Sequence, residues 1–209
     1  GNPNTLLIDC RTEVEYYYVG HPVDAINVEW NTAPEFEVNP HFADDATFKK
    51  FVAAAHAAGI RIIVDMAYNH TGDCHFAFEE SWKQGPQSPR YDWYEWKRWP
   101  PPAGAKPGDE SFKAADYYDC WWGFAIHPNL NFDLSRPNNQ ENNIRDRAQA
   151  QVNQDLVDYV LSSAKYWIGD LGIDGFRLDV PNEVPFWFWS LFRAAVQFPY
   201  EDPCFDLLE

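Results

Sequence analysis

Residues 172–183 read Gly-Ile-Asp-Gly-Phe-Arg-Leu-Asp-Val-Pro-Asn-Glu, and the fold follows from this stretch. The side chains of a strand alternate between two faces, so one face carries Phe176, Leu178 and Val180. The other face carries Ile173, Gly175, Arg177 and Asp179. An apolar face for helices to cover, with Arg and Asp near the carboxyl end, is typical of a barrel strand that presents catalytic side chains. A structural ion pair between Arg177 and Asp179 fits the same spacing equally well.

Helices and strands alternate before and after this stretch. Residues 60–66, Ile-Arg-Ile-Ile-Val-Asp-Met, are expected to form a parallel strand buried on both faces. An amphipathic helix precedes them and is stopped by Gly59. Its apolar side is predicted to carry Phe48, Phe51, Val52, Ala55 and Ala58. A long helix is predicted over 143–168 and an apolar helix over 184–193; the long helix has a stripe of Val152, Leu156, Val160 and Ala164. The alternation predicts an α/β protein.

The segment 71–140 is too long for a simple loop between a strand and a helix. It is rich in tryptophan and tyrosine and contains the breaker run 100–107, Pro-Pro-Pro-Ala-Gly-Ala-Lys-Pro. The aromatic density favours an inserted subdomain that packs over a disordered excursion. Flat sugar rings stack on aromatic faces, but an aromatic cluster is also the ordinary content of a hydrophobic core. Both interpretations of these aromatic residues stay open.

Composition and charge limit the partners of the protein. The chain has 209 residues, 45% hydrophobic and 17% aromatic, which is enough for a packed core. A formal charge of −16 argues against binding to nucleic acid or to an anionic membrane. No apolar run is long enough to span a bilayer, and charged residues through 1–30 argue against a signal peptide.

The four cysteines are widely spaced and form no C-x-x-C pair. They are Cys10, Cys74, Cys120 and Cys204. Such spacing is typical of incidental thiols rather than of a zinc site or a disulfide framework. It favours a reducing, cytoplasmic setting.

The N-terminal segment resembles the start of a rhodanese-like domain. The matching residues are 7–12 (Leu-Ile-Asp-Cys-Arg-Thr), Glu15-Tyr16, Gly20-His21 and 25–28 (Ala-Ile-Asn-Val). The resemblance ends after about 35 residues, and no later loop matches the one that carries the family's sulfur-binding cysteine. Cys10 ends a predicted strand and is expected to be a small buried residue. A sulfurtransferase remnant that uses Cys10 is therefore a minor alternative.

Residues from about 36 to 198 resemble the α-amylase superfamily of glycoside hydrolases, in its neopullulanase and cyclomaltodextrinase branch. Two blocks carry the resemblance: 65–70 (Asp-Met-Ala-Tyr-Asn-His) and 175–179 (Gly-Phe-Arg-Leu-Asp). A third block, 129–133 (Asn-Leu-Asn-Phe-Asp), matches the end of that family's inserted domain. Residues 118–124 and 180–184 are similar to the named branch. The motifs occur in the family's order and spacing.

The resemblance implies a role for each matching residue. Asp179 would be the nucleophile of a retaining glycosidase, and Arg177 on the same face would favour its ionised form. His70 would hydrogen-bond the sugar, while Asp65 and Asn69 would brace the site. No cofactor is required. Calcium is an open possibility, because the residue that matches Asn69 binds it in some members.

The general acid is less well marked than the nucleophile. Retaining hydrolysis needs a second carboxyl group about 5 Å from the first. Glu209 follows Asp179 at the spacing of the family's acid, but Leu208 stands where the family has glycine. The block that carries the family's later Asp is absent. Glu183 is expected to cap the next helix or to line the rim of the site instead of acting as the acid.

Together these features predict an α/β fold, a partial (β/α) TIM-type barrel with an aromatic-rich inserted subdomain at about 71–140. The expected domains are a rhodanese-like segment, 1–36, and a truncated α-amylase-type barrel, 37–209. The expected function is retaining hydrolysis of α-glucans or maltooligosaccharides, with weak or no activity. A non-catalytic α-glucan binder is the alternative. The sequence does not determine the oligomeric state.

Overall fold

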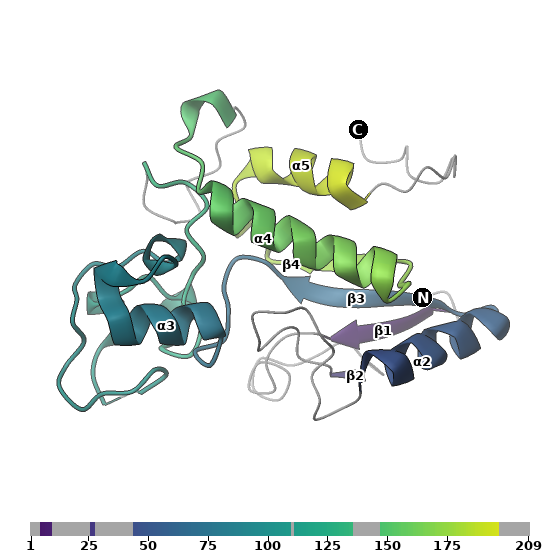
Figure 1. Ribbon diagram of the computed structural model, residues 1–209, viewed down its shortest axis with the longest axis horizontal. Coiled ribbons are helices and arrows are strands. Elements are labelled where there is room, and N and C mark those ends of the chain that lie inside the picture. Colours follow the sequence, from purple (N-terminus) through teal and green to yellow (C-terminus); the bar gives the residue numbers. More distant parts are fainter. Residues whose placement is uncertain (1–4, 10–25, 28–43, 110, 136–146, 197–209) are drawn as a thin grey trace.

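A four-stranded parallel sheet forms the centre of the protein (Figure 1). The computed structural model describes residues 5–9, 26–27, 44–109, 111–135 and 147–196. The strand order is β2-β1-β3-β4. The strands are β1 (Thr5–Asp9), β2 (Ile26–Asn27), β3 (Arg61–Ala67) and β4 (Gly175–Asp179). Strand β1 pairs with both β2 and β3, so the N-terminal segment and the rest of the chain contribute to one sheet.

Strand β3 lies between β1 and β4 and is almost wholly buried. Ile62, Val64 and Met66 are inaccessible to solvent, as the apolar run 60–66 predicts for a parallel strand. The register of β3 with β4 places Asp65 opposite Arg177 and Ala67 opposite Asp179. The polar residues of the two strands therefore share one face of the sheet at the carboxyl ends.

Two helices flank the sheet where the sequence predicts helix. Helix α2 (Asp45–Ala57) begins after Asp44, whose carboxylate accepts a hydrogen bond from the Thr47 N–H. It ends before Gly59, whose φ of 75° suits glycine. Helix α5 (Phe186–Val196) extends three residues beyond the predicted 184–193. Two residues of the predicted apolar side of α2, Phe51 and Ala58, are exposed instead.

The prediction of one long helix over 143–168 is wrong for residues 147–153, the part before α4 that the structure describes. Helix α4 spans Gln154–Lys165, followed by a π-helical turn, η6 (Tyr166–Asp170). The backbone before α4 makes hydrogen bonds outside the helix: Val152 forms a bridge with Asp133, and the Asn153 N–H donates to the Phe132 carbonyl oxygen. Val152 therefore lies outside the helix, whereas Leu156, Val160 and Ala164 form its buried stripe.

The aromatic segment after β3 packs into a lobe around α3 (Phe76–Gln84), beyond the carboxyl end of β3 (Figure 1). Its short 3-10 turns are η1 (Gly85–Gln87), η2 (Tyr91–Trp93), η3 (Ala114–Asp116) and η4 (Trp121–Gly123). Two further turns, η5 (Arg147–Gln149) and η7 (Pro181–Glu183), lie outside the lobe. Phe78, Tyr94 and Tyr118 are fully buried in the lobe, which joins the core of the sheet. Within the described ranges, no helix is long and apolar enough to cross a membrane.

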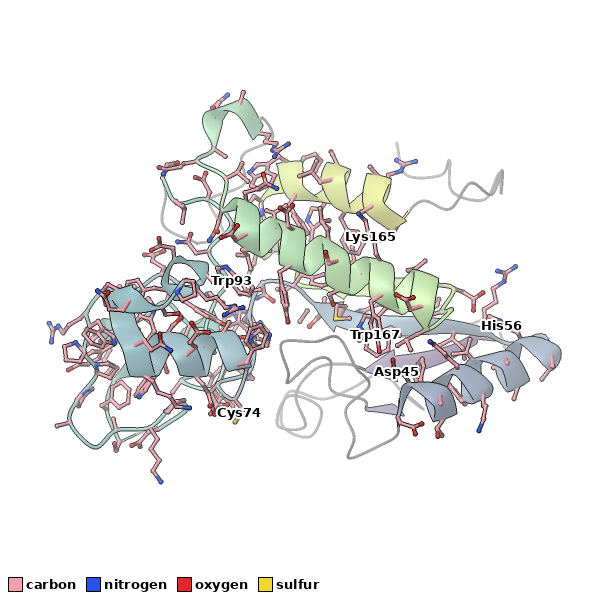
Figure 2. The ribbon with its side chains drawn as sticks, in the orientation of Figure 1. Asp45, His56, Cys74, Trp93, Lys165 and Trp167 are labelled. Atoms are coloured by element: carbon pink, nitrogen blue, oxygen red, sulfur yellow. The ribbon has the colours of Figure 1, made fainter. Side chains whose placement is uncertain are left out.

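Helices α4 and α5 run side by side along the sheet (Figure 1). Helix α2 contacts η6, the turn after α4, where Phe48 packs edge-on against Trp167, labelled in Figure 2. Trp93, labelled in the same figure at the boundary of the lobe, contacts Tyr159 of α4. The lobe is thus anchored to the helix that precedes β4.

Asp174 joins three elements at the amino end of the sheet. Its carboxylate accepts hydrogen bonds from the Ile62 N–H (2.7 Å) and from Arg61 (3.3 Å), and it contacts Nε2 of His56 at 2.8 Å. The Asp174 N–H donates in turn to the Ile62 carbonyl oxygen. These contacts fix the start of β3 against the segment that enters β4.

We expect Asp174→Ala to lower the free energy of unfolding by about 1–3 kcal/mol, because the Ile62 N–H loses its side-chain acceptor. Urea denaturation measures the change. Asp170→Ala, at an exposed position in η6, is the matched control and should change stability by less than about 0.5 kcal/mol. Equal effects of the two substitutions would contradict this role of Asp174.

His75 connects the lobe to helix α4. It is buried, its Nδ1 accepts a hydrogen bond from the Ala77 N–H at the start of α3, and its Nε2 lies 3.1 Å from the hydroxyl of Tyr159. Burial, and then the positive charge of Arg90, lower the pKa of His75 to about 3. The imidazole is therefore neutral in the folded protein.

This burial makes stability depend on pH. An unfolded chain protonates His75 below its ordinary pKa of 6.5 while the folded chain does not, so stability falls as pH drops from about 6.5 towards 3. The slope due to His75 should approach about 1.4 kcal/mol per pH unit. His75→Asn keeps an acceptor at the helix cap and should remove that slope. Urea denaturation of both proteins from pH 6.5 to 4.5 measures it, and parallel curves would contradict the prediction.

Candidate active site

A buried carboxylate and a partly buried one share a single guanidinium at the carboxyl ends of β3 and β4. Nη1 of Arg177 lies 3.0 and 3.2 Å from the two carboxylate oxygens of Asp65, and 2.5 Å from Oδ1 of Asp179. The Asp65 side chain is inaccessible, whereas that of Asp179 is 16% exposed. Arg177 therefore holds Asp179 at the surface of the site while it compensates the buried charge of Asp65.

Electrostatics strengthen this arrangement. Burial alone would lower the pKa of Arg177, but the hydrogen bond and charge of Asp65, together with Asp179, raise that pKa above its ordinary value. The guanidinium therefore stays charged beside both carboxylates. A carboxylate nucleophile carries a negative charge, and the guanidinium of Arg177 lies where it can balance that charge on Asp179.

Asn69 links β3 to the turn that follows β4. Its side-chain N–H donates to Oε2 of Glu183 at 2.9 Å, and its Oδ1 lies 2.8 Å from Nδ1 of His70. Both Asn69 and His70 are buried. Glu183 thus holds the Asn69 side chain from the turn that follows β4. This role differs from the helix cap that the sequence suggested as one possibility.

The chain makes an abrupt turn directly after Asp179. Val180 has left-handed backbone angles (φ 44°, ψ 45°), an unfavourable conformation for a β-branched residue. It therefore leaves the strand, although the alternation of side chains had placed it with Phe176 and Leu178. The indole N–H of Trp189 donates to the Pro181 carbonyl oxygen at 2.9 Å, and the Glu183 N–H donates to that of Val180. Such strain is characteristic of functional sites.

Aromatic rings from the lobe cover His70. The ring of Trp121 stacks on His70 with centroids 5.2 Å apart and planes 10° apart, and His127 lies 4.9 Å away on a tilted plane. Backbone bridges join His70 to Asn129 and Cys120 to Pro128, which hold this part of the lobe against the end of β3. The lobe therefore forms one wall of the site.

Five site residues that the sequence singled out lie in two contacting groups at the carboxyl ends of β3 and β4: Arg177 with Asp65 and Asp179, and Asn69 with His70. Glu209, the candidate acid, and Cys10 lie outside the described residues. Sequence reasoning missed the bond between Asn69 and Glu183, the Trp121–His70 stack and the strained Val180. Only the Trp-Trp-Gly run at 121–123 gave a signal for any of these.

The residues around Asn69 do not fit a calcium site. Calcium takes six to eight oxygen ligands, but Oδ1 of Asn69 already contacts His70 and its amide nitrogen contacts Glu183. Among the described residues, no group of three or more His, Cys, Asp and Glu side chains could hold a metal ion. We therefore assign no role to calcium.

The charged side chains meet where adjacent parallel strands end, which is the place where open α/β sheets bind their ligands. A sequence model of the alpha-amylase catalytic domain matches residues 25–202. Because this match spans most of the chain, the protein belongs to the alpha-amylase catalytic domain family. The family resemblance seen in the two sequence blocks is confirmed.

Individual relatives agree with this assignment. The chain is 31% identical over 169 residues to a cyclomaltodextrinase from Thermoanaerobacter pseudethanolicus, covering 81% of this chain and 25% of the relative. It also resembles the solved structures of a type III pullulan hydrolase from Thermococcus kodakarensis (TM-score 0.61, 33% identity, 80% of this chain and 24% of that one). A debranching enzyme from Nostoc punctiforme gives a TM-score of 0.66 at 26% identity, over 92% of this chain and 34% of that one.

The chain spans about a quarter of the length of the curated relatives that it matches first. The family match begins at residue 25, inside the segment expected to be rhodanese-like, and these matches give that resemblance no support. The domain boundary near residue 36 and the limits of the insertion stay predictions.

Proposed function

We propose that this chain carries the nucleophile site of a retaining glycosidase that acts on α-glucans. The observation that carries the proposal is the shared guanidinium of Arg177, which holds the accessible carboxylate of Asp179 beside the buried Asp65. Relatives are named cyclomaltodextrinase, neopullulanase and maltogenic amylase, which supports an α-glucan as the substrate class. The four parallel strands would form part of a (β/α) barrel.

In the proposed reaction, an oxygen of the Asp179 carboxylate attacks the anomeric carbon and forms an ester bond as the bond to the leaving group breaks. The oxygen of the leaving group takes up one proton in this step. Water then cleaves the ester, which releases the sugar with its original α configuration, restores the carboxylate and gives up one proton, so protons balance over the two steps. Arg177 would balance the charge of the free carboxylate. His70, fixed by Asn69 and Trp121, would contact the bound sugar. Asp65 would position Arg177, and Asn69 would position His70.

A maltooligosaccharide fluoride tests this proposal, because fluoride leaves without help from a general acid. We expect fluoride release in the presence of the protein, with the α anomer as the first product seen by NMR. Product of β configuration would contradict a retaining nucleophile. Absence of fluoride release above the uncatalysed rate would count against any catalytic role of the site.

The second candidate function is binding of an α-glucan without catalysis. The exposed rings of Trp122 and Phe124 support it, because they contact the two rings that pack against His70, those of Trp121 and His127. It predicts that maltooligosaccharides bind with the same affinity to the wild type and to Asp179→Asn, and that neither releases fluoride. The two candidates are therefore separated by one pair of assays on one pair of proteins.

A further inference from the structure

We propose that the indole ring of Trp122 is a stacking platform for a pyranose ring of the glucan, farther along the sugar chain than the ring at His70. This inference rests on the proposed function and extends its site outward along the lobe. Trp122 stacks on Trp121, which stacks in turn on His70 of the candidate site.

Trp122 is placed unlike the buried tryptophans of the protein. Its side chain is 74% exposed, whereas the tryptophans of the core are at most 5% exposed: Trp93, Trp121, Trp167 and Trp187. Its backbone is also left-handed, with φ 51° and ψ 19°, a conformation that bulky residues rarely adopt. Exposure of so large an apolar surface and backbone strain both oppose folding. A binding role would account for their occurrence at one residue.

The ring of Trp122 continues a stack that begins in the candidate site. It lies 5.2 Å from the ring of Trp121 at an interplanar angle of 24°, and Trp121 stacks in turn on His70. Trp121 covers one face of Trp122, so the exposed area includes the opposite face. Three rings thus lead from the buried His70 to the surface, and Trp122 is the exposed end of this stack.

The turn that carries Trp122 is held in place before any ligand binds. The Trp121 N–H donates to the His127 carbonyl oxygen, and the His127 N–H donates to that of Phe124. Gly123 follows with φ 82°, so two successive left-handed residues project the ring outward. A platform fixed in this way loses little conformational freedom on binding.

The chemistry of the platform fits a neutral sugar. The face of an aromatic ring is electron-rich and attracts the weakly positive C–H groups on the flat side of a pyranose. The formal charge of the chain, −16, disfavours anionic ligands. A second copy of this chain, docked through Trp122 and the half-exposed Phe124, is the competing occupant.

The test compares maltose, too short to span the stack, with maltoheptaose by isothermal titration calorimetry. Trp122→Gly removes the ring at a backbone position that suits glycine, and Trp122→Phe keeps a ring. We expect Trp122→Gly to weaken maltoheptaose binding about fivefold to tenfold and maltose binding less than about twofold. Trp122→Phe should retain most of the affinity. Phe51→Ala, an exposed aromatic on α2, is the control and should change neither.

Three results would overturn the platform. Equal affinities of wild type and Trp122→Gly for maltoheptaose would reject it while leaving the proposed function intact. A dimer seen by sedimentation that Trp122→Gly converts to monomer, with sugar binding unchanged, would assign the ring to a protein interface. Failure of the wild type to bind either sugar would instead reject the proposed function, and the platform with it.

Discussion

Arg177→Met should lower the free energy of unfolding by about 3 kcal/mol, because it removes the guanidinium that compensates a fully buried carboxylate. The Asp65 side chain is inaccessible to solvent, and both of its carboxylate oxygens contact Nη1 of Arg177. Arg177 itself is 47% exposed, so we place the effect at the lower end of the range for buried pairs. Urea denaturation at neutral pH measures it.

Two further variants separate the charge of Arg177 from its packing. Arg193→Met removes an exposed guanidinium from α5 and should change stability by less than about 0.5 kcal/mol. The double variant Asp65→Asn with Arg177→Met should cost less than the sum of the single variants, since no buried charge is then left behind. Additive effects would mean that the two side chains stabilise the protein independently.

Asp179→Asn should reduce fluoride release from a maltooligosaccharide fluoride by about a thousandfold or more, because an amide cannot form the ester intermediate. Asp179 is 16% exposed and makes an ion pair with Arg177, so the fold should tolerate the isosteric change. A matched control is Asp119→Asn in the lobe, where the carboxylate pairs with Lys97 and Asn129 instead. It should leave the rate within about threefold of wild type.

Stability must be measured together with the rate. If Asp179→Asn unfolds the protein, loss of activity says nothing about the nucleophile, so the urea midpoint is part of the same experiment. Comparable rates for Asp179→Asn and wild type, with both proteins folded, would contradict the role proposed for Asp179.

The sequence predicts the strands well where hydrophobic runs are unambiguous. The apolar run 60–66 lies within one residue of β3, and the alternation in 172–183 separates Phe176 from Arg177 and Asp179. Prediction from sequence fails where tertiary hydrogen bonds override the local preference for a helix. The apolar pattern of the helix includes Val152, but Val152 forms a backbone bridge with Asp133 and therefore lies outside α4. No local pattern could reveal a partner nineteen residues away.

The same limit applies to the candidate site. Spacing within one strand places Arg177 beside Asp179, but only the register between β3 and β4 places it beside Asp65. The contact between Asn69 and Glu183 likewise joins residues 114 positions apart. The left-handed Val180 runs against its own residue type, so sequence preference could not indicate it. Strain of this kind, next to the proposed nucleophile, appears only in the folded chain.

Covalent trapping shows whether Asp179 is the nucleophile. The protein would be incubated with a maltooligosaccharide fluoride that is fluorinated at C2 of the reacting sugar, then digested and mapped by mass spectrometry. The fluorine at C2 destabilises the positively charged transition states and slows cleavage of the ester, so an intermediate accumulates. We predict one glycosyl adduct, on Asp179. An adduct on another carboxylate, or no adduct on a protein that binds the sugar, would contradict the role of Asp179 as the nucleophile.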